Sequence, residues 1–367
     1  MEGWWPVGSG VEGWWPAGRR LSGLVADPPV ADPPVADRPV AERPVAAASR
    51  RQRAPADPHS LIAAARAGDP RALARLVSLV ENESAELRRV LKVVVPMTGH
   101  AHIVGLTGAP GVGKSTVTDA LVRHYRNEGL RVGVLAVDPS SPFSGGALLG
   151  DRVRMQEHAT DDQVFIRSMA SRGHLGGLSL ATPQALRILD AAGFDVVLIE
   201  TVGVGQAEVE IASLADSALV VVAPGLGDSI QAAKAGILEI ADIFIVNKND
   251  RPGAQEVIRD LRTMLAMARY EPGDWKPPIV STAAATGDGI ADLAAAIGRH
   301  RVWLADSGSL AERRRARARE EISAIALAEL RRRMGGLPGE SRLDDLADRV
   351  TAGELDPYSA ADELISG

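Results

Sequence analysis

Cysteine is absent from the chain. Its absence excludes disulfide bonds, thiolate metal ligands and thiol nucleophiles, and it suits a reducing compartment. The chain also lacks any apolar run near the roughly 20 residues that span a bilayer, and it does not begin with a basic stretch followed by an apolar one. We therefore expect a cytoplasmic protein that has no membrane partner.

Basic residues are also fewer than acidic ones. The 41 Lys and Arg residues are outnumbered by 47 Asp and Glu residues, which gives a net charge of −6. Nucleic-acid-binding domains usually carry a basic surface, so we expect no nucleic-acid partner. Hydrophobic residues make up 46% of the chain. A sizeable core can therefore form without disulfides or metals.

Residues 1–55 consist largely of short repeats rich in proline and tryptophan. EGWWPVG at 2–8 recurs as EGWWPAG at 12–18, and four units of the type ADPPV fill 26–45. Proline at this density favours extended chain that forms neither helix nor sheet, so we predict a disordered tail. The tryptophans are either a docking motif or part of a non-functional tail, and a misassigned start codon would also explain the segment.

Helical periodicity begins in the segment 56–99, which we predict to be an N-terminal helical segment. Asp69 followed by Pro70 is typical of an N-cap and a first helical position. Apolar residues then recur at helical spacing at Leu73, Leu76, Val77 and Val80, and again at Leu87, Val90, Leu91 and Val94. We expect these amphipathic helices to pack on the domain that follows.

The segment 100–301 alternates short apolar strands with helices. The strand candidates are 102–108, 131–138, 164–169, 195–201, 217–223, 242–247 and 277–282. Their Val, Ile and Leu runs are almost continuous, which is typical of strands buried on both faces of a mostly parallel sheet. We therefore predict an α/β domain in which helices flank a central sheet and ligands bind at the carboxyl ends of the strands.

The segment GAPGVGKST at 108–116 matches GxxxxGK[ST] between a predicted strand and a predicted helix. Its glycines let backbone N–H groups surround an anion, and the helix N-terminus adds partial positive charge. Lys114 is expected to reach the β- and γ-phosphates, and Ser115 to bind Mg²⁺. The predicted fold class is therefore a P-loop NTPase. The predicted phosphate-binding residues are Gly108, Ala109, Pro110, Gly111, Val112, Gly113, Lys114, Ser115 and Thr116.

Three acidic residues are candidates for the metal side of this site and, with Lys114, for catalysis. Glu200 closes an apolar strand and begins ETVG, in the place of the DxxG element of GTPases, so Gly203 N–H would contact the γ-phosphate. Glutamate is one methylene longer than aspartate, which favours a contact with Mg²⁺ through water. Asp138 and Asp151 flank a Gly/Ser-rich loop that is typical of a nucleotide switch, and either could bind Mg²⁺ or position water. Asp138 could equally cap the Pro-Ser-Ser turn that follows it.

The glutamine that orients the attacking water in Ras-like proteins is missing from its usual place. Its position holds Val204, and the nearest glutamine is Gln206. An apolar side chain cannot orient water, so we expect slow intrinsic hydrolysis that depends on a partner or on dimerisation.

Base specificity is indicated by NKND at 247–250, at the end of another predicted strand. The Asp250 carboxylate can accept two hydrogen bonds from guanine, and adenine lacks that pair of donors. Lys248 can lay its aliphatic stem over the base. The predicted guanine-binding residues are Asn247, Lys248, Asp250, Ser281, Thr282 and Ala283. The predicted ligands are therefore GTP and GDP with Mg²⁺.

The segment 302–367 is predicted to be helical and rich in arginine. Around 311–333, one helical face carries Ile322, Ala326, Leu330 and Met334. This narrow apolar stripe belongs either to a solvated helix or to a dimerisation arm.

From about residue 57 onward the chain resembles the MeaB/ArgK/MMAA family, the metallochaperone-type GTPases associated with adenosylcobalamin-dependent acyl-CoA mutases. The motifs that carry the resemblance stand in family order. They are GAPGVGKST (108–116), VDPSSPFSGGALLGDRVRM (137–155), FIRSMASRGHLGGL (165–178), ETVGVGQAE (200–208), PGLGDSIQAAKAGILEIAD (224–242) and NKND (247–250).

The resemblance implies a homodimer formed through the C-terminal helical region. It implies that the partner is methylmalonyl-CoA mutase or a related cobalamin-dependent acyl-CoA mutase, and that GTP binding and hydrolysis gate cofactor loading and protect that enzyme. It also implies that 137–155 and the loop after Glu200 are nucleotide switches. The segment 224–239, with Asp228, Gln231 and Lys234, would then be a further switch that relays the nucleotide state to the mutase.

Three other functions compete with this interpretation. A kinase could use the same P-loop, and the family has also been described as a transport-system kinase, but NKND would have no role in a kinase. A nickel-insertion GTPase would need a cluster of thiolates or histidines, and the chain offers only the pair His100 and His102. A binding module would hold GTP without hydrolysing it, and single-turnover hydrolysis would distinguish it from a GTPase.

Overall fold

The computed structural model describes residues 57–82, 84, 86–139, 158, 160–171, 181–201, 207–225, 240–335 and 339–366. All of them belong to one compact unit that covers 54–367. The repeat tail predicted for 1–55 lies outside the described residues.

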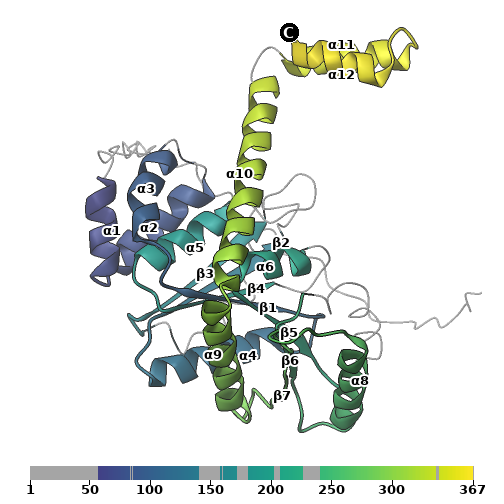
Figure 1. The fold of residues 1–367 in the computed structure, drawn as a ribbon. Helices are drawn as coiled ribbons and strands as arrows, with labels where there is room; N and C mark the ends of the chain where they lie inside the picture. Colours follow the sequence, from purple (N-terminus) through teal and green to yellow (C-terminus); the bar gives the residue numbers. More distant parts are fainter. Residues whose placement is uncertain are drawn as a thin grey trace, which may run out of the picture. The chain divides into compact units, whose positions relative to one another are not determined.

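Seven parallel strands form the central sheet, in the order β3-β2-β4-β1-β5-β6-β7 (Figure 1). The strands are β1 (His102–Thr107), β2 (Val132–Pro139), β3 (Val164–Ser171), β4 (Val196–Thr201), β5 (Ser217–Val222), β6 (Ile243–Val246) and β7 (Ile279–Ser281). Each corresponds to a strand predicted from the sequence, so the predicted parallel α/β fold is confirmed. From β1 the sheet extends through β4 to β2 on one side and through β5 to β6 on the other. The carboxyl end of β1 is therefore a switch point, where ligands of such sheets bind.

The strands are continuously apolar because successive side chains enter two different cores. In β4, Val197 and Ile199 belong to the core that α5 (Ala181–Ala191) and α6 (Ala207–Leu214) cover. Val196 and Leu198 belong to the core on the opposite face, beneath α4 (Lys114–Asn127) and α9 (Ile290–Asp306). A third core lies under α8 (Ala254–Met267), against β5 and β6. Period-two alternation thus persists in the structure although both faces are apolar.

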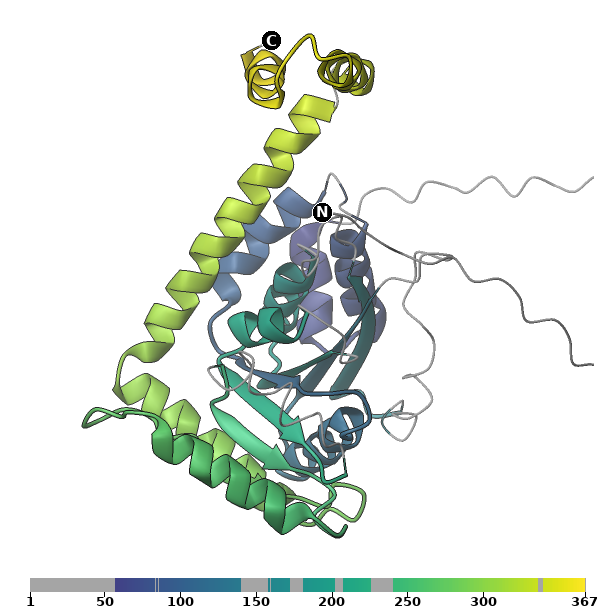
Figure 2. The same cartoon turned by 90° about the vertical axis from the view of Figure 1, so that its right-hand side faces the viewer.

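In the described residues before the sheet, the helices are α1 (Pro58–Arg66), α2 (Pro70–Glu81) and α3 (Leu87–Val94), and a short turn, η1 (Val95–Met97), follows them. Asp69 caps α2 by accepting a 2.8 Å hydrogen bond from the backbone N–H of Arg71, and Pro70 occupies the first turn, as predicted. The apolar face of α2 enters the same core as Ile188 and Leu189 of α5. The N-terminal helices therefore extend the core above one face of the sheet, and Figure 2 shows them beside α5.

The C-terminal region consists of α10 (Ser309–Gly335), α11 (Gly339–Thr351) and α12 (Pro357–Ser366). The two last helices lie side by side, and an ion pair joins Arg349 to Glu363 at 3.0 Å. Helical N-terminal and C-terminal regions were predicted together with the sheet, and both are present.

Arginine–aspartate contacts fix α10 to the amino ends of β5 and β6. Arg313 donates two 2.8 Å hydrogen bonds to Asp242, which immediately precedes β6. Asp216, which immediately precedes β5, accepts from Arg314 at 2.8 Å and from Arg317 at 3.0 Å. Burial alone would raise the pKa values of both carboxyl groups. Arg314 and Arg317 hold the pKa of Asp216 below its ordinary value, and hydrogen bonds from His300 and Arg313 do the same for Asp242. Both aspartates therefore stay ionised inside the protein.

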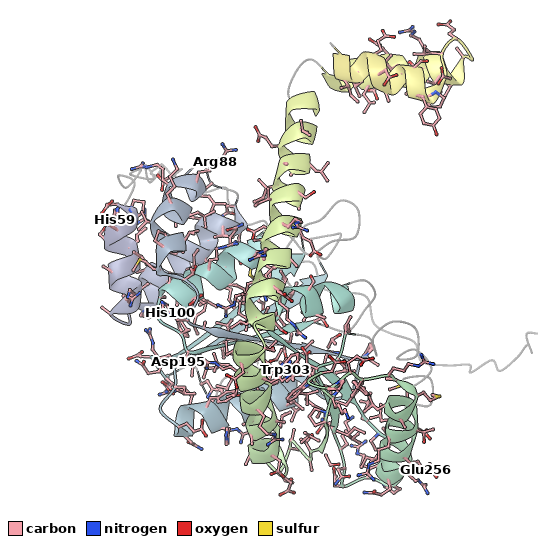
Figure 3. The ribbon with its side chains drawn as sticks, viewed as in Figure 1. His59, Arg88, His100, Asp195, Glu256 and Trp303 are labelled. Atoms are coloured by element: carbon pink, nitrogen blue, oxygen red, sulfur yellow. The ribbon has the colours of Figure 1, made fainter. Side chains whose placement is uncertain are left out.

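A series of buried polar side chains begins at Asp242, at the same amino ends of the strands. His300 Nε2 lies 3.3 Å from Asp242 Oδ1, Ser217 Oγ lies 2.7 Å from His300 Nδ1, and His102 Nε2 lies 2.9 Å from Ser217 Oγ. The order Asp–His–Ser is that of a hydrolytic triad. However, Ser217 and His300 are both 0% exposed, so no substrate can reach them. This series of side chains is therefore structural. Trp303, labelled on α9 in Figure 3, stacks on His300 and covers it further.

Within the parts of the chain that the structure describes, no helix is both long enough and apolar enough to cross a membrane.

Candidate nucleotide-binding site

The loop between β1 and α4 has the backbone geometry that phosphate binding requires. Gly108 has a φ of 139°, and a Cβ atom there would lie 2.2 Å from the carbonyl oxygen of Val221 in β5. Gly113 has a φ of 97°, and its Cβ would lie 2.5 Å from Nδ2 of Asn247. Only glycine tolerates both the left-handed conformation and the close approach. The loop is thus pressed against the ends of two neighbouring strands and leads directly into α4.

Lys114 is the first residue of α4 and is buried, with 7% of its surface exposed. Its ammonium group donates to the carbonyl oxygens of Gly108 at 2.6 Å and Ala109 at 3.2 Å. The positive charge therefore lies inside the curve of the loop, next to the positive end of the α4 helix dipole. This is the electrostatic environment that a nucleotide phosphate needs.

Glu200 lies at the carboxyl end of β4, beside the P-loop strand. It pairs in register with Leu106 of β1 and with Ala136 of β2. Its side chain is 2% exposed, and its Oε2 accepts a 2.6 Å hydrogen bond from the hydroxyl of Thr118 in α4. Asp138 is two residues beyond Ala136 in β2. The backbone thus places the ends of β2 and β4 next to each other, as the predicted metal side of the site requires.

Asn247 binds the P-loop to the loop that follows β7. Its Nδ2 donates to the carbonyl oxygen of Val112 at 2.9 Å. Its Oδ1 accepts from the hydroxyl of Thr282 and from the backbone N–H of Ala284, both at 3.1 Å. Because Asn247 is 3% exposed, these bonds form away from water and fix the relative positions of the two loops.

Lys248 and Asp250 complete NKND on the surface. Lys248 has a φ of 59°, which is rare for a residue other than glycine, and its Nζ donates to the carbonyl oxygen of Gly111 at 2.6 Å. Its side chain therefore crosses from NKND to the P-loop. Asp250 is exposed, and Ser281 is half-buried at the end of β7. Thr282 and Ala283, by contrast, are buried beside Asn247.

The structure thus brings together the P-loop, Glu200, NKND and the 281–283 segment. Other predicted positions lie outside the described residues. These are Asp151, Gly203, Val204, Gln206, Asp228, Gln231 and Lys234, together with the side chain of Asp138. Within the part that is described, no group of three or more His, Asp or Glu side chains could hold a metal ion.

Two contacts at the site were not predicted from the sequence. They join the Thr118 hydroxyl to Glu200 and the N–H of Ala284 to Asn247. Thr118 is four residues after Lys114, so helical spacing places it on the same face of α4, and that spacing was a usable signal. The N–H of Ala284 has no such signal, because which N–H of a loop reaches a neighbouring side chain depends on the fold of the loop.

Comparisons with known proteins agree with this geometry. The family model described as "Methylmalonyl Co-A mutase-associated GTPase MeaB" matches residues 73–337. A Pyrococcus horikoshii protein named as a GTPase is 51% identical over 307 residues, which cover 83% of this chain and 96% of the relative. The mouse protein named "Methylmalonic aciduria type A homolog, mitochondrial" is 31% identical over 319 residues, which cover 81% of this chain and 76% of the relative. Among solved structures, one described as "LAO/AO transport system kinase" is 28% identical and covers 85% of this chain and 97% of its own, with a TM-score of 0.63.

Proposed function

Because the chain belongs to the family of methylmalonyl-CoA mutase-associated GTPases, we propose that it is a nucleotide-controlled chaperone of an adenosylcobalamin-dependent methylmalonyl-CoA mutase. It is a P-loop GTPase, which converts GTP to GDP and phosphate. In the proposed cycle, the nucleotide state gates cofactor loading and protects the mutase. The observation that carries the nucleotide part is the direct linkage of NKND to the P-loop through Asn247 and Lys248.

That linkage favours one ligand that occupies both loops at once. Asn247 and Lys248 hold the carbonyl oxygens of Val112 and Gly111, so a movement of the phosphate loop is transmitted to the base loop. GTP would place its phosphates over Gly108–Thr116 and its guanine at Asp250. A ligand with phosphates alone would use only half of this arrangement.

Mg²⁺ fits the donors on the metal side. The Ser115 hydroxyl and the Glu200 carboxylate are hard oxygen donors, which is the set that Mg²⁺ prefers. Ser115 follows Lys114 at the start of α4, and Glu200 is buried against the same helix. When bound, Mg²⁺ would neutralise charge on the phosphates. Asp138 and Asp151 are proposed to complete the metal side or to position water, with Gly203 at the γ-phosphate.

The proposed switches connect this site to the mutase. They are 137–155, the loop after Glu200, and 224–239 with Asp228, Gln231 and Lys234. The support is positional, since β2, β4 and β5 lead into these three segments at the carboxyl edge of the sheet. With Val204 in place of a glutamine, we propose slow intrinsic hydrolysis that the mutase or dimerisation accelerates.

A homodimer through α10 is also proposed. This helix contacts its own protein with charged side chains. Glu321 pairs with Arg187 of α5 through two 2.5 Å hydrogen bonds. Glu329 lies 3.6 Å from Arg88, which projects from α3 in Figure 3.

Among the described side chains of α10, four large apolar ones lie on its surface. Ile322 is 69% exposed, Ile325 41%, Leu327 53% and Leu330 54%. A helix normally buries its apolar face against its own core, so this reversed arrangement favours burial against a second copy.

The protein is proposed to act in the cytoplasm.

A kinase is the second candidate function. It is favoured by the similarity to the solved structure described as a transport system kinase. The two candidates differ in the fate of the γ-phosphate, since a kinase transfers it to an acceptor protein and a GTPase releases it to water. Inorganic phosphate released in proportion to GTP consumed supports the GTPase without a kinase function.

The chaperone proposal is tested by capture of purified methylmalonyl-CoA mutase on the immobilised full chain. Capture is compared with GDP and with a non-hydrolysable GTP analogue. We expect retention that differs between the two nucleotides, and loss of that difference in Lys114→Ala, which cannot hold the phosphates. Equal retention with both nucleotides, or no retention, contradicts the proposal.

A further inference from the structure

A buried hydroxyl joins the P-loop helix to the strand that carries the proposed metal-side acid. The hydroxyl belongs to Thr118 of α4, and it lies 2.6 Å from Oε2 of Glu200 in β4. Thr118 is 0% exposed and Glu200 is 2% exposed. Two apolar residues of α4, Val117 and Leu121, share a core with the strand residue Leu198. The polar pair is therefore embedded where α4 packs on β4.

The distance identifies where the hydroxyl proton points. Thr118 Oγ1 also lies 3.1 Å from the carbonyl oxygen of Lys114, but a hydroxyl has a single proton to donate. The contact to Glu200 is the shorter of the two, and 2.6 Å falls in the range of an O–H that donates to an ionised carboxylate. The shorter distance therefore assigns the proton to Glu200, and the hydroxyl holds one oxygen of that carboxylate.

Packing alone does not require a hydroxyl at this place. Valine has nearly the same shape as threonine and would fill the same space in an apolar contact between helix and strand. A buried hydroxyl costs free energy unless it forms a hydrogen bond. The value of threonine here is therefore the bond to Glu200.

We propose that Thr118 is a positioning residue that orients the Glu200 carboxylate for Mg²⁺-dependent nucleotide binding. Lys114, Ser115 and Thr118 lie within the first five residues of α4. One rigid helix therefore carries the ammonium group proposed for the phosphates, the hydroxyl proposed for Mg²⁺ and the hydroxyl that contacts Glu200. Mg²⁺ demands near-ideal octahedral geometry, which makes a fixed carboxylate valuable. This inference rests on the metal-side role proposed above for Glu200.

The test is a Mg²⁺ titration of fluorescent GDP binding to the full chain and to Thr118→Val. We expect the half-saturating Mg²⁺ concentration to rise about tenfold or more, because partners that orient metal ligands typically contribute about 10- to 100-fold in metal affinity. GDP affinity in excess EDTA should stay unchanged, since the phosphate loop itself is intact. Thr118→Ser keeps the hydroxyl and should restore most of the Mg²⁺ response.

The matched control is Thr182→Val, because Thr182 is also a fully buried threonine on a helix, α5. It should leave the Mg²⁺ titration unchanged. An unaltered titration in Thr118→Val overturns the inference, as does an equal shift in the control. If Thr118→Val does not fold, a Thr118→Ser titration that is shifted as strongly as that of Glu200→Gln overturns it instead.

Glu200→Gln separates this inference from the role proposed for Glu200. If Glu200→Gln leaves the Mg²⁺ response unchanged, the proposed role of Glu200 is wrong. If Glu200→Gln weakens the response and Thr118→Val does not, only the inference about Thr118 is wrong. In the double variant, Thr118→Val should add nothing to the loss caused by Glu200→Gln, and a fully additive loss would show that the two residues act independently.

Discussion

The Asp216→Asn substitution tests how α10 is held on the sheet. Asp216 is 0% exposed, and its carboxylate accepts hydrogen bonds from Arg314, Arg317 and the backbone N–H of Ile103. Asparagine has the same shape but carries no charge. Its amide nitrogen would also direct hydrogens toward a side chain that can only donate. The substitution therefore removes the attraction and leaves the arginine charges near the interior.

The expected loss in the free energy of unfolding at pH 7 is about 3 kcal/mol. Removing one partner of a buried ion pair typically costs about 3–5 kcal/mol. The lower end applies because Arg314 and Arg317 are 28% and 12% exposed, so water can partly solvate them after the change. Since the charged partners of Asp216 hold its pKa below the ordinary value, its stabilisation is present above about pH 4 and is lost as the pH falls further. The variant and the parent should therefore converge in acid.

Urea unfolding at pH 7 and at pH 3 measures this difference directly. Asp306→Asn, at the exposed end of α9, is the matched control and should change the free energy of unfolding by less than about 0.5 kcal/mol. Hydrogen exchange should rise along α10 in Asp216→Asn and not in the control. A loss below about 1 kcal/mol at pH 7, or an equal loss at both pH values, would refute the argument that an ionised Asp216 fixes α10.

Three further predictions concern single side chains. Asn247→Ala leaves three buried hydrogen-bonding partners unpaired and should lower the free energy of unfolding by about 3 kcal/mol without any nucleotide, measured by urea unfolding. A loss below about 1 kcal/mol would mean that Asn247 does not join the loops. Asp250→Asn should shift selectivity from GTP toward XTP by about 10- to 100-fold in competition binding, because xanthine presents an acceptor where guanine presents a donor; unaltered selectivity would remove Asp250 from base recognition. Burial lowers the pKa of His102 from 6.5 to about 4, so the folded state excludes a proton that the unfolded chain binds. The free energy of unfolding should therefore be unaffected by His102 above pH 6.5 and should fall by about 3 kcal/mol on acidification to pH 4. In His102→Gln the dependence of the free energy of unfolding on pH should be flatter. Parallel dependences in the parent and the variant would show that His102 does not cause this loss.

The features that were predictable from the sequence are those encoded over a few neighbouring residues. The seven strands were identifiable because most of them are short Val/Ile/Leu runs between turn signals. The Asp69 cap was identifiable because an aspartate before a proline marks a helix start by local geometry alone. The P-loop required only its own spacing between a strand and a helix. Family membership followed from the order of such motifs.

Contacts between distant parts of the chain were not predictable in this way. The pair formed by Arg313 and Asp242 spans 71 positions, and Thr118 and Glu200 are 82 positions apart. Around Arg313 the sequence contains a run of arginines, which composition alone represents as a solvated helix face. Only the fold shows which of them meet buried carboxylates and which face solvent.

The same sheet separates the stability of α10 from nucleotide binding. Asp242 and Asn247 lie at opposite ends of β6, about 16 Å apart at ~3.3 Å per residue. Between them β6 is fully buried and paired with β5 on one side and β7 on the other, so the sheet, rather than α10, sets the position of Asn247. Sites this far apart that share no contact usually act additively to within about 0.5 kcal/mol. Asp216→Asn should therefore change GDP affinity by no more than about twofold while it destabilises the fold. A larger change would mean that the docking of α10 affects nucleotide binding at NKND through the strands.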